Sequence, residues 1–228
     1  MSLTWIEKWT NFLCRAKKTT FNVAENFVTG WLFDPPFQNG KSIVVCHGSW
    51  GPGTTNATIE YVKTFAVLGF KVLLIFFEDE FGNPISIERD IIEAQDAELW
   101  LGGDVSIIGT SRGGYVALET FERDLTNFNK CVTFAAPTDM TRFNIFSDYF
   151  KDIPDPMTRA RNGEYHRPQD MLIIHGIKDH VVPFFHGKDF SGLVGCLLET
   201  FNDGHNVFRN PYAVRKCIDF LSLEKVDG

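Results

Sequence analysis

The sequence lacks the patterns that mark several large classes of protein. No apolar run approaches the roughly 18 residues of a membrane-spanning helix. The start of the chain shows neither the apolar stretch nor the cleavage site of a signal peptide. Internal repeats, low-complexity segments and linkers are absent as well. We therefore expect the 228 residues to form a soluble globular protein with a single main domain.

Positive charge is scarce. Asp and Glu number 29 against 22 Lys and Arg, the net charge is −7, and no basic block is dense. Proteins that bind a nucleic-acid backbone do so with clustered Lys and Arg. We therefore expect no nucleic-acid partner.

Cysteine is sparse and scattered. The five residues form no C-x-x-C pair, and no group of Cys and His has the spacing of zinc ligands. We expect no metal site and no cofactor, and we interpret the cysteines as free thiols, several of them buried. Such thiols fit a reducing compartment, which favours a cytoplasmic location. The cysteines are Cys14, Cys46, Cys131, Cys196 and Cys217.

Aromatic residues are plentiful, with 22 Phe, and some of them begin an amphipathic pattern at the N-terminus. Apolar residues in the first 18 positions recur at helical spacing, which predicts a helix over residues 1–18 ahead of a domain at 19–228. We expect its apolar face to pack on the domain. Contact with a membrane surface is the alternative, because basic residues follow the apolar ones. The apolar residues are Trp5, Ile6, Trp9, Phe12 and Leu13, and the basic ones are Arg15, Lys17 and Lys18.

The rest of the chain alternates short apolar runs with helical patterns. This alternation predicts an α/β protein with a mostly parallel sheet, in which ligands bind beyond the carboxyl ends of the strands. Strands are predicted on both sides of 24–26 and within 41–48, 70–77, 104–110, 130–137, 170–176 and 195–203. Helices are predicted over 56–69, 86–103, 112–125 and 211–224.

The pattern G-x-S-x-G occurs at Gly109–Gly113, with Ser111 at its centre. The pattern alone is weak, and a glycine-rich bend without chemistry would also produce it. Here, however, a predicted strand precedes it and a predicted helix follows it, as a nucleophile elbow requires. We therefore predict that Ser111 is a nucleophile.

A serine nucleophile needs a base, and the base needs an orienting carboxylate. His205 follows the last predicted strand and is the predicted base, while Asp179 follows the preceding strand and is the predicted acid. Asp139 also follows a strand and is a rival acid. The order Ser111, Asp179, His205 matches that of α/β-hydrolases. We interpret His175 as a packed core residue and Asp203 as a turn former, and we assign no role to His166, His180 or His186.

Acyl transfer also needs donors for the oxyanion that develops in the transition state. The backbone N–H of Arg112, directly after the serine, is one predicted donor. The other is the backbone N–H of Trp50 in the glycine-rich stretch after residues 41–46, with Ser49 as its rival.

Four stretches together resemble the motif blocks of the α/β-hydrolases, and they are most similar to those of the prolyl oligopeptidase and dienelactone hydrolase-like branches. The resemblance covers roughly Asn22 to Leu221 and implies an eight-stranded, mostly parallel sheet flanked by helices. It also implies a Ser-His-Asp triad of Ser111, His205 and Asp179. The four stretches are "VVCHGSWGPG", "IIGTSRGGYVAL", "LIIHGIKDHVVP" and "NDGHN".

The chain departs from these relatives in three ways. It has no room for the β-propeller of prolyl oligopeptidases, and its nucleophile is serine where dienelactone hydrolases use cysteine. Only 31 residues separate Pro137 from Gln169, too few for a large cap domain, so we expect an open site. Aromatic residues of this segment could line its wall, although their helical spacing is more typical of core packing. They are Phe143, Phe146, Tyr149 and Phe150.

These features predict a serine hydrolase that cleaves small carboxylic esters or thioesters through an acyl-enzyme. A peptidase or amidase of prolyl oligopeptidase type is the first alternative. A non-catalytic binding protein on the same fold is the second, because fold alone does not specify function.

Overall fold

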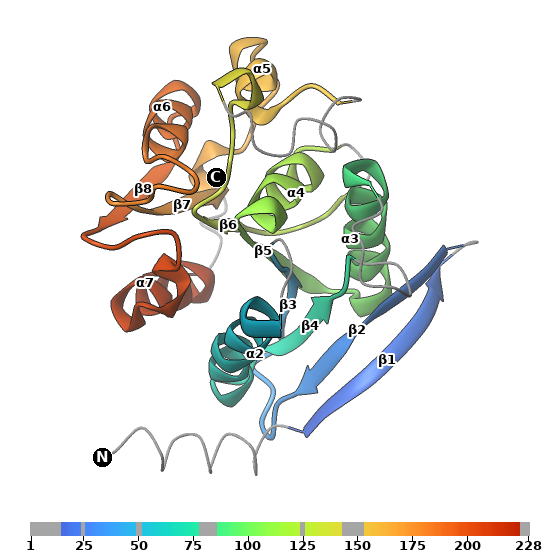
Figure 1. Cartoon of the computed structure of the whole chain (residues 1–228). Coiled ribbons are helices and arrows are strands. Elements are labelled where there is room, and N and C mark those ends of the chain that lie inside the picture. Colours follow the sequence, from blue (N-terminus) through green and yellow to red (C-terminus); the bar gives the residue numbers. More distant parts are fainter. Residues whose placement is uncertain are drawn as a thin grey trace.

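The computed structural model describes residues 15–23, 26–48, 52–77, 86–123, 126–142 and 153–223, which form an eight-stranded sheet with helices on both faces (Figure 1). The strands lie in the order β1-β2-β4-β3-β5-β6-β7-β8. Their bounds are β1 Arg15–Val23, β2 Asn26–Asp34, β3 Lys41–Cys46, β4 Lys71–Ile75, β5 Asp104–Thr110, β6 Cys131–Phe134, β7 Met171–Gly176 and β8 Leu197–Phe201.

The sheet is antiparallel at one edge and parallel elsewhere. β1 pairs antiparallel with β2 from Arg15↔Asp34 to Val23↔Asn26, and β2 pairs antiparallel with β4. All the pairs from β4 through β3 to β8 are parallel. The predicted eight-stranded, mostly parallel sheet is therefore confirmed, and the carboxyl ends of its parallel strands meet along one edge.

Helices cover both faces of the sheet. The longer ones are α2 Pro52–Val67, α3 Ile87–Leu101, α4 Arg112–Phe121, α6 Phe185–Val194 and α7 Pro211–Ser222. A short α5, Pro156–Arg161, and 3-10 turns at Met140–Arg142, Pro168–Asp170 and Val207–Arg209 complete the described elements. In Figure 1, α3 and α4 lie on one face of the sheet, while α2 and α7 lie on the other.

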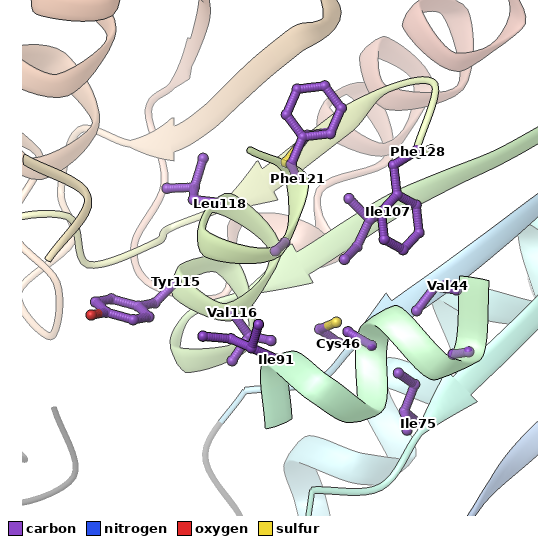
Figure 2. Packing of buried hydrophobic residues seen from close by; sticks show 14 of the residues in the cluster. Val44, Cys46, Ile75, Ile91, Ile107, Tyr115, Val116, Leu118, Phe121 and Phe128 are labelled. Atoms are coloured by element: carbon purple, nitrogen blue, oxygen red, sulfur yellow. The ribbon is translucent and has the colours of Figure 1, made fainter. Parts of the chain in front are cut away.

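Alternate residues of the central strands enter two different cores. In β3, Val44 and Cys46 pack with α3 and α4, whereas Ile43 and Val45 pack with α2 and α7. Figure 2 shows the first of these cores, in which Ile91 of α3 and Val116 of α4 lie near the strand residues. Because both faces are buried, the strands read as continuous apolar runs rather than alternating ones.

Several predicted boundaries need correction. Residues 15–18 belong to β1 rather than to the predicted N-terminal helix, of which residues 1–14 lie outside the described residues. The helix α4 ends at Phe121, short of the predicted residue 125. The helix α6 was not predicted from the sequence.

In the described part of the chain, no helix has both the length and the apolar character needed to cross a bilayer. Of the five cysteines, the four that the structure describes are free thiols, and three of these, Cys46, Cys131 and Cys217, are buried. Cys14 lies outside the described residues. The residues that the structure describes hold no group of three or more His, Cys, Asp or Glu side chains arranged to bind a metal ion.

Candidate active site

Ser111 lies on a strained turn between β5 and α4. Its φ of 52° and ψ of −121° are unusual for a residue with a side chain, and its backbone N–H donates to the carbonyl of Phe134 on the neighbouring strand. Although Ser111 is the N-cap of α4, its hydroxyl makes no capping hydrogen bond. The strained backbone therefore presents Oγ to partners outside the helix.

Glycines allow this turn to be so tight. A Cβ on Gly113 would lie 2.2 Å from the carbonyl oxygen of Cys46 and 2.4 Å from that of His47. A Cβ on Gly109 would lie 2.1 Å from the carbonyl oxygen of Gly113. Only glycine fits at either position, so the first turn of α4 packs directly against the end of β3.

His205 brings its imidazole to Ser111 from the loop after β8. Its Nε2 lies 3.0 Å from Ser111 Oγ, and its Nδ1 lies 2.8 Å from Asp179 Oδ2. A carboxylate only accepts hydrogen bonds, so Nδ1 carries the proton and Nε2 accepts from the serine hydroxyl. The structure thus brings together all three side chains that the sequence analysis selected, each from a different strand end.

Asp179 is held firmly behind His205. Its side chain is fully buried, and its Oδ1 accepts from the backbone N–H groups of Val181 and Val182, both at 2.9 Å. Burial alone would raise the pKa of Asp179. Hydrogen bonds from His175 and His205 and from the Val182 amide outweigh burial and hold this pKa below its usual range. Asp179 is therefore ionised at neutral pH.

The loop that carries His205 is also braced. Asp203 Oδ1 accepts from the Gly204 amide at 2.8 Å, and its Oδ2 accepts from the Asn210 side chain at 3.2 Å. The Asp203 carbonyl accepts from the Lys178 amide at 2.9 Å, which ties this loop to the one that carries Asp179. Asp203 therefore braces this loop through both its carboxylate and its carbonyl.

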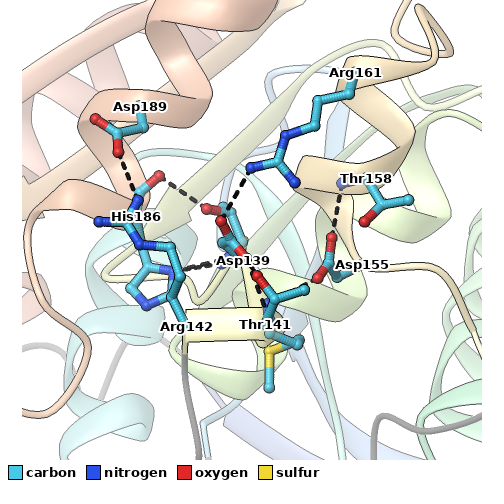
Figure 3. A network of polar contacts seen from close by, with 10 residues as sticks. Asp139, Thr141, Arg142, Asp155, Thr158, Arg161, His186 and Asp189 are labelled. Atoms are coloured by element: carbon cyan, nitrogen blue, oxygen red, sulfur yellow. Dashed lines mark hydrogen bonds and ion pairs between the residues drawn. The ribbon is translucent and has the colours of Figure 1, made fainter.

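The rival acid Asp139 belongs to a separate network (Figure 3). Its carboxylate accepts from Thr141 Oγ1 at 2.5 Å and from the Arg161 guanidinium at 3.2 Å. The nearby His186 accepts at Nδ1 from the backbone N–H groups of Thr138 and Asp139, both at 3.2 Å. His205 instead points its Nδ1 at Asp179.

On the other side of Ser111, His47 links the ends of β3 and β4. Its Nε2 accepts from the Phe77 backbone N–H at 3.2 Å, so its Nδ1 donates to the Gly48 carbonyl at 2.6 Å. Burial lowers the pKa of His47 to about 4, which keeps the ring neutral. Gly48 lies beside Ser111, since a Cβ there would be 3.2 Å from Ser111 Cβ.

One of the two predicted oxyanion donors can be placed. Arg112 is the first residue of α4, where backbone N–H groups have no partner within the helix. Trp50 and its rival Ser49 lie outside the described residues, as do Phe143, Phe146, Tyr149 and Phe150.

Two contacts that support the site were not predicted from the sequence, one between Arg112 and Asp90 and one between His175 and Asp179. The buried guanidinium of Arg112 forms an ion pair with Asp90 on α3. Burial raises the pKa of the Asp90 carboxyl group, and Arg112 lowers it. His175, predicted to be a core residue, is indeed fully buried, but it also contacts Asp179. Asp90 was predicted only to lie within the helix over 86–103. A charged residue at an otherwise apolar helical position would have been the signal for Asp90.

The sequence matches no protein-family model, and a search of curated proteins finds no match. Solved structures do match. The acylaminoacyl peptidase of Pyrococcus horikoshii superposes with a TM-score of 0.70 at 14% identity, over 99% of this chain and 45% of the peptidase. Esterase 2 of Thermogutta terrifontis gives a TM-score of 0.68 at 17% identity over 90% and 93% of the two chains. The Pyrococcus furiosus esterase Pf2001 gives 0.69 at 16% identity, over 94% of each.

The fold is that of the α/β-hydrolases. The predicted fold class is thereby confirmed. The chain spans less than half of the peptidase but nearly all of either esterase.

Proposed function

We propose that this protein is a serine hydrolase that cleaves carboxylic esters or thioesters through an acyl-enzyme. Ser111 is the nucleophile, His205 the general base and acid, and Asp179 the residue that orients His205. One observation carries the proposal above all. The chain of hydrogen bonds from Ser111 Oγ to His205 and on to Asp179 has donors and acceptors in the required order.

In the proposed reaction, Ser111 Oγ attacks the carbonyl carbon while His205 Nε2 takes the hydroxyl proton. The bond between the carbonyl carbon and the leaving oxygen or sulfur then breaks, and His205 returns the proton to the leaving group. Water attacks the acyl-enzyme and gives a proton to His205. That proton goes back to Ser111 as the acid leaves.

Arg112 supports the developing oxyanion through its backbone N–H at the start of α4. The positive end of the helix dipole favours negative charge at the same place. We propose Trp50 as the second donor. The neutral, anchored His47 and its bond to Gly48 hold the backbone two residues before Trp50.

An ester or thioester substrate is supported by the two esterases, which superpose on this chain over 93% and 94% of their own lengths. A peptidase or amidase is the second candidate, because the acylaminoacyl peptidase also superposes, although over only 45% of its length. A panel of chromogenic esters, thioesters and aminoacyl amides separates the two. Faster turnover of the amides would favour the peptidase.

Ser111→Ala tests the nucleophile directly. We expect a fluorophosphonate probe to label the wild-type protein and not this variant, because the probe captures an activated serine. Ser222→Ala is the matched control, since Ser222 is the exposed last residue of α7 and its hydroxyl donates to the Ile218 carbonyl. A folded wild-type protein that resists labelling would instead favour the non-catalytic binding protein.

A further inference from the structure

A second imidazole contacts Asp179 in addition to that of His205. His175 is the next-to-last residue of β7 and is fully buried. Its Nε2 lies 2.9 Å from the carbonyl oxygen of Val182 and 3.5 Å from Asp179 Oδ2. The same Oδ2 atom accepts from His205 Nδ1. One carboxylate oxygen therefore faces two histidines.

The neighbours of His175 determine which nitrogen carries its proton. The two groups facing Nε2, a carbonyl and a carboxylate, can only accept hydrogen bonds, so Nε2 is protonated. The other nitrogen, Nδ1, has no hydrogen-bond partner in the described residues. A Cβ on Gly187 of α6 would come within 2.7 Å of this Nδ1. The ring is thus confined between the backbone of α6 and the acceptors around Asp179.

The contacts of Asp179 show what His175 contributes. The amides of Val181 and Val182 hold Oδ1, but both belong to the loop that follows Asp179 itself. His175 is the contact from the strand that faces Oδ2, and it also bonds the carbonyl of Val182. A single Nε2–H group therefore ties both the carboxylate and its loop to the sheet.

We propose that His175 is a positioning residue for the reaction proposed above, on which this inference rests. It fixes the plane of the Asp179 carboxylate, and so the direction in which Asp179 holds His205. His175 touches neither Ser111 nor His205, so its effect passes through Asp179. Its loss should lower kcat and leave KM nearly unchanged.

Three variants test this role. His175→Leu removes the donor at similar volume, and His175→Gln places an amide N–H where Nε2 stood. His180→Gln is the matched control, because His180 follows Asp179 directly but is exposed. We expect kcat to fall by about tenfold or more in His175→Leu, because this variant loses the N–H donor that faces the charged Asp179 carboxylate. We expect kcat within about threefold of wild type for His175→Gln and no change for His180→Gln.

The proton shared by His205 Nδ1 and Asp179 gives a second readout that does not depend on turnover. Such a proton resonates far downfield in the NMR spectrum, and its loss in His205→Gln assigns it. We expect His175→Leu to shift or broaden this signal and His175→Gln to restore it. The signal tests the positioning role even if the protein hydrolyses no ester, so failure of the proposed function is recognised separately.

Two outcomes would overturn the proposal. One is a His175→Leu protein with wild-type kcat and an unshifted signal. The other is an equal loss of kcat in His175→Leu and His175→Gln with the signal unshifted in both, which would indicate a packing role alone. Circular dichroism of each variant checks that it is folded, and if His175→Leu fails to fold, the comparison is made between His175→Gln and His175→Asn. In His175→Asn the amide N–H lies near the former Nδ1 position and cannot reach Asp179, so kcat and the NMR signal should change as in His175→Leu.

Discussion

Two neighbouring strands of this sheet each end near a buried aspartate with a histidine close by, and the two arrangements differ in one respect. At Asp179, in the loop after β7, His205 turns a protonated Nδ1 toward the carboxylate. At Asp139, after β6, His186 of α6 turns an unprotonated Nδ1 toward the backbone amides of Thr138 and Asp139. The Asp139 carboxylate takes its hydrogen bonds from Thr141 and Arg161 instead.

This difference shows that proximity of a histidine and an aspartate does not make a proton relay. The backbone decides which ring nitrogen is protonated, and therefore whether the imidazole can donate to the carboxylate. Burial lowers the pKa of His186 to about 4, so its ring stays neutral. The network around Asp139 holds the described 3-10 turn in place, whereas that around Asp179 leaves one imidazole nitrogen facing Ser111.

The largest expected effect separates the two aspartates by activity. Asp179→Asn should lower turnover by about 10⁴-fold, because an amide would favour the wrong tautomer of His205. Asp139→Asn should leave turnover within a few-fold of wild type. Steady-state kinetics on a chromogenic ester measures both. Collapse of activity in Asp139→Asn with near-normal turnover in Asp179→Asn would transfer the role of the acid to Asp139.

A third buried carboxylate, that of Glu119, should make the stability of the protein depend on pH in the opposite direction from Asp139 and Asp179. Burial raises the pKa of Glu119 to about 7, although Arg159 donates to it at 2.9 Å. Since the folded-state pKa exceeds the unfolded one, Glu119 makes its full contribution to stability at low pH. That contribution is lost as the pH rises from about 4.5 through 7, by on the order of 3 kcal/mol.

Glu119→Gln should flatten that part of the stability curve. Urea unfolding of both proteins at several pH values measures it, and the difference between the two curves isolates Glu119 from other titrating groups. Asp139 and Asp179 should behave oppositely, because bonded donors outweigh burial and lower their pKa values. Parallel curves for wild type and Glu119→Gln would show that Arg159 keeps Glu119 ionised throughout.

The smallest expected effects concern the stability of the Asp139 network. Asp139→Asn should lower the free energy of unfolding by about 1–3 kcal/mol, because buried hydrogen bonds to a charged acceptor are weakened. Arg161→Gln should cost less than about 1 kcal/mol, since the Arg161 side chain is 53% exposed. Chemical denaturation measures both. A larger loss in Arg161→Gln would mean that the ion pair, rather than Thr141, holds Asp139.

Much of the parallel sheet could be predicted from sequence because its strands are buried on both faces. The run at Asp104–Thr110 matches β5 residue for residue, and Ser86 was correctly placed at the start of α3. The geometry around Ser111, His205 and Asp179 also follows the predicted positions, since Ser111 directly follows β5 and the other two lie in the loops after β8 and β7. Chain order and strand ends were sufficient to bring these three side chains together.

The features that were missed depend on contacts between distant segments. α6 contains Gly187 and Gly192, which weaken a helical pattern, yet Gly187 is needed where the helix meets His175. β1 begins with charged residues and is specified by its pairing with β2. The Asp90–Arg112 pair joins two helices, and each partner alone resembles an ordinary exposed residue of a first helical turn.

The absent side chain at Gly113 has a consequence for engineering. Because the start of α4 rests on the carbonyls of Cys46 and His47, any displacement of those carbonyls shifts the serine turn by a similar amount. Redesign that aims to change the range of substrates should therefore begin after Gly48 and keep this backbone contact intact. Arg112 and Asp90 should be exchanged only together, as one unit.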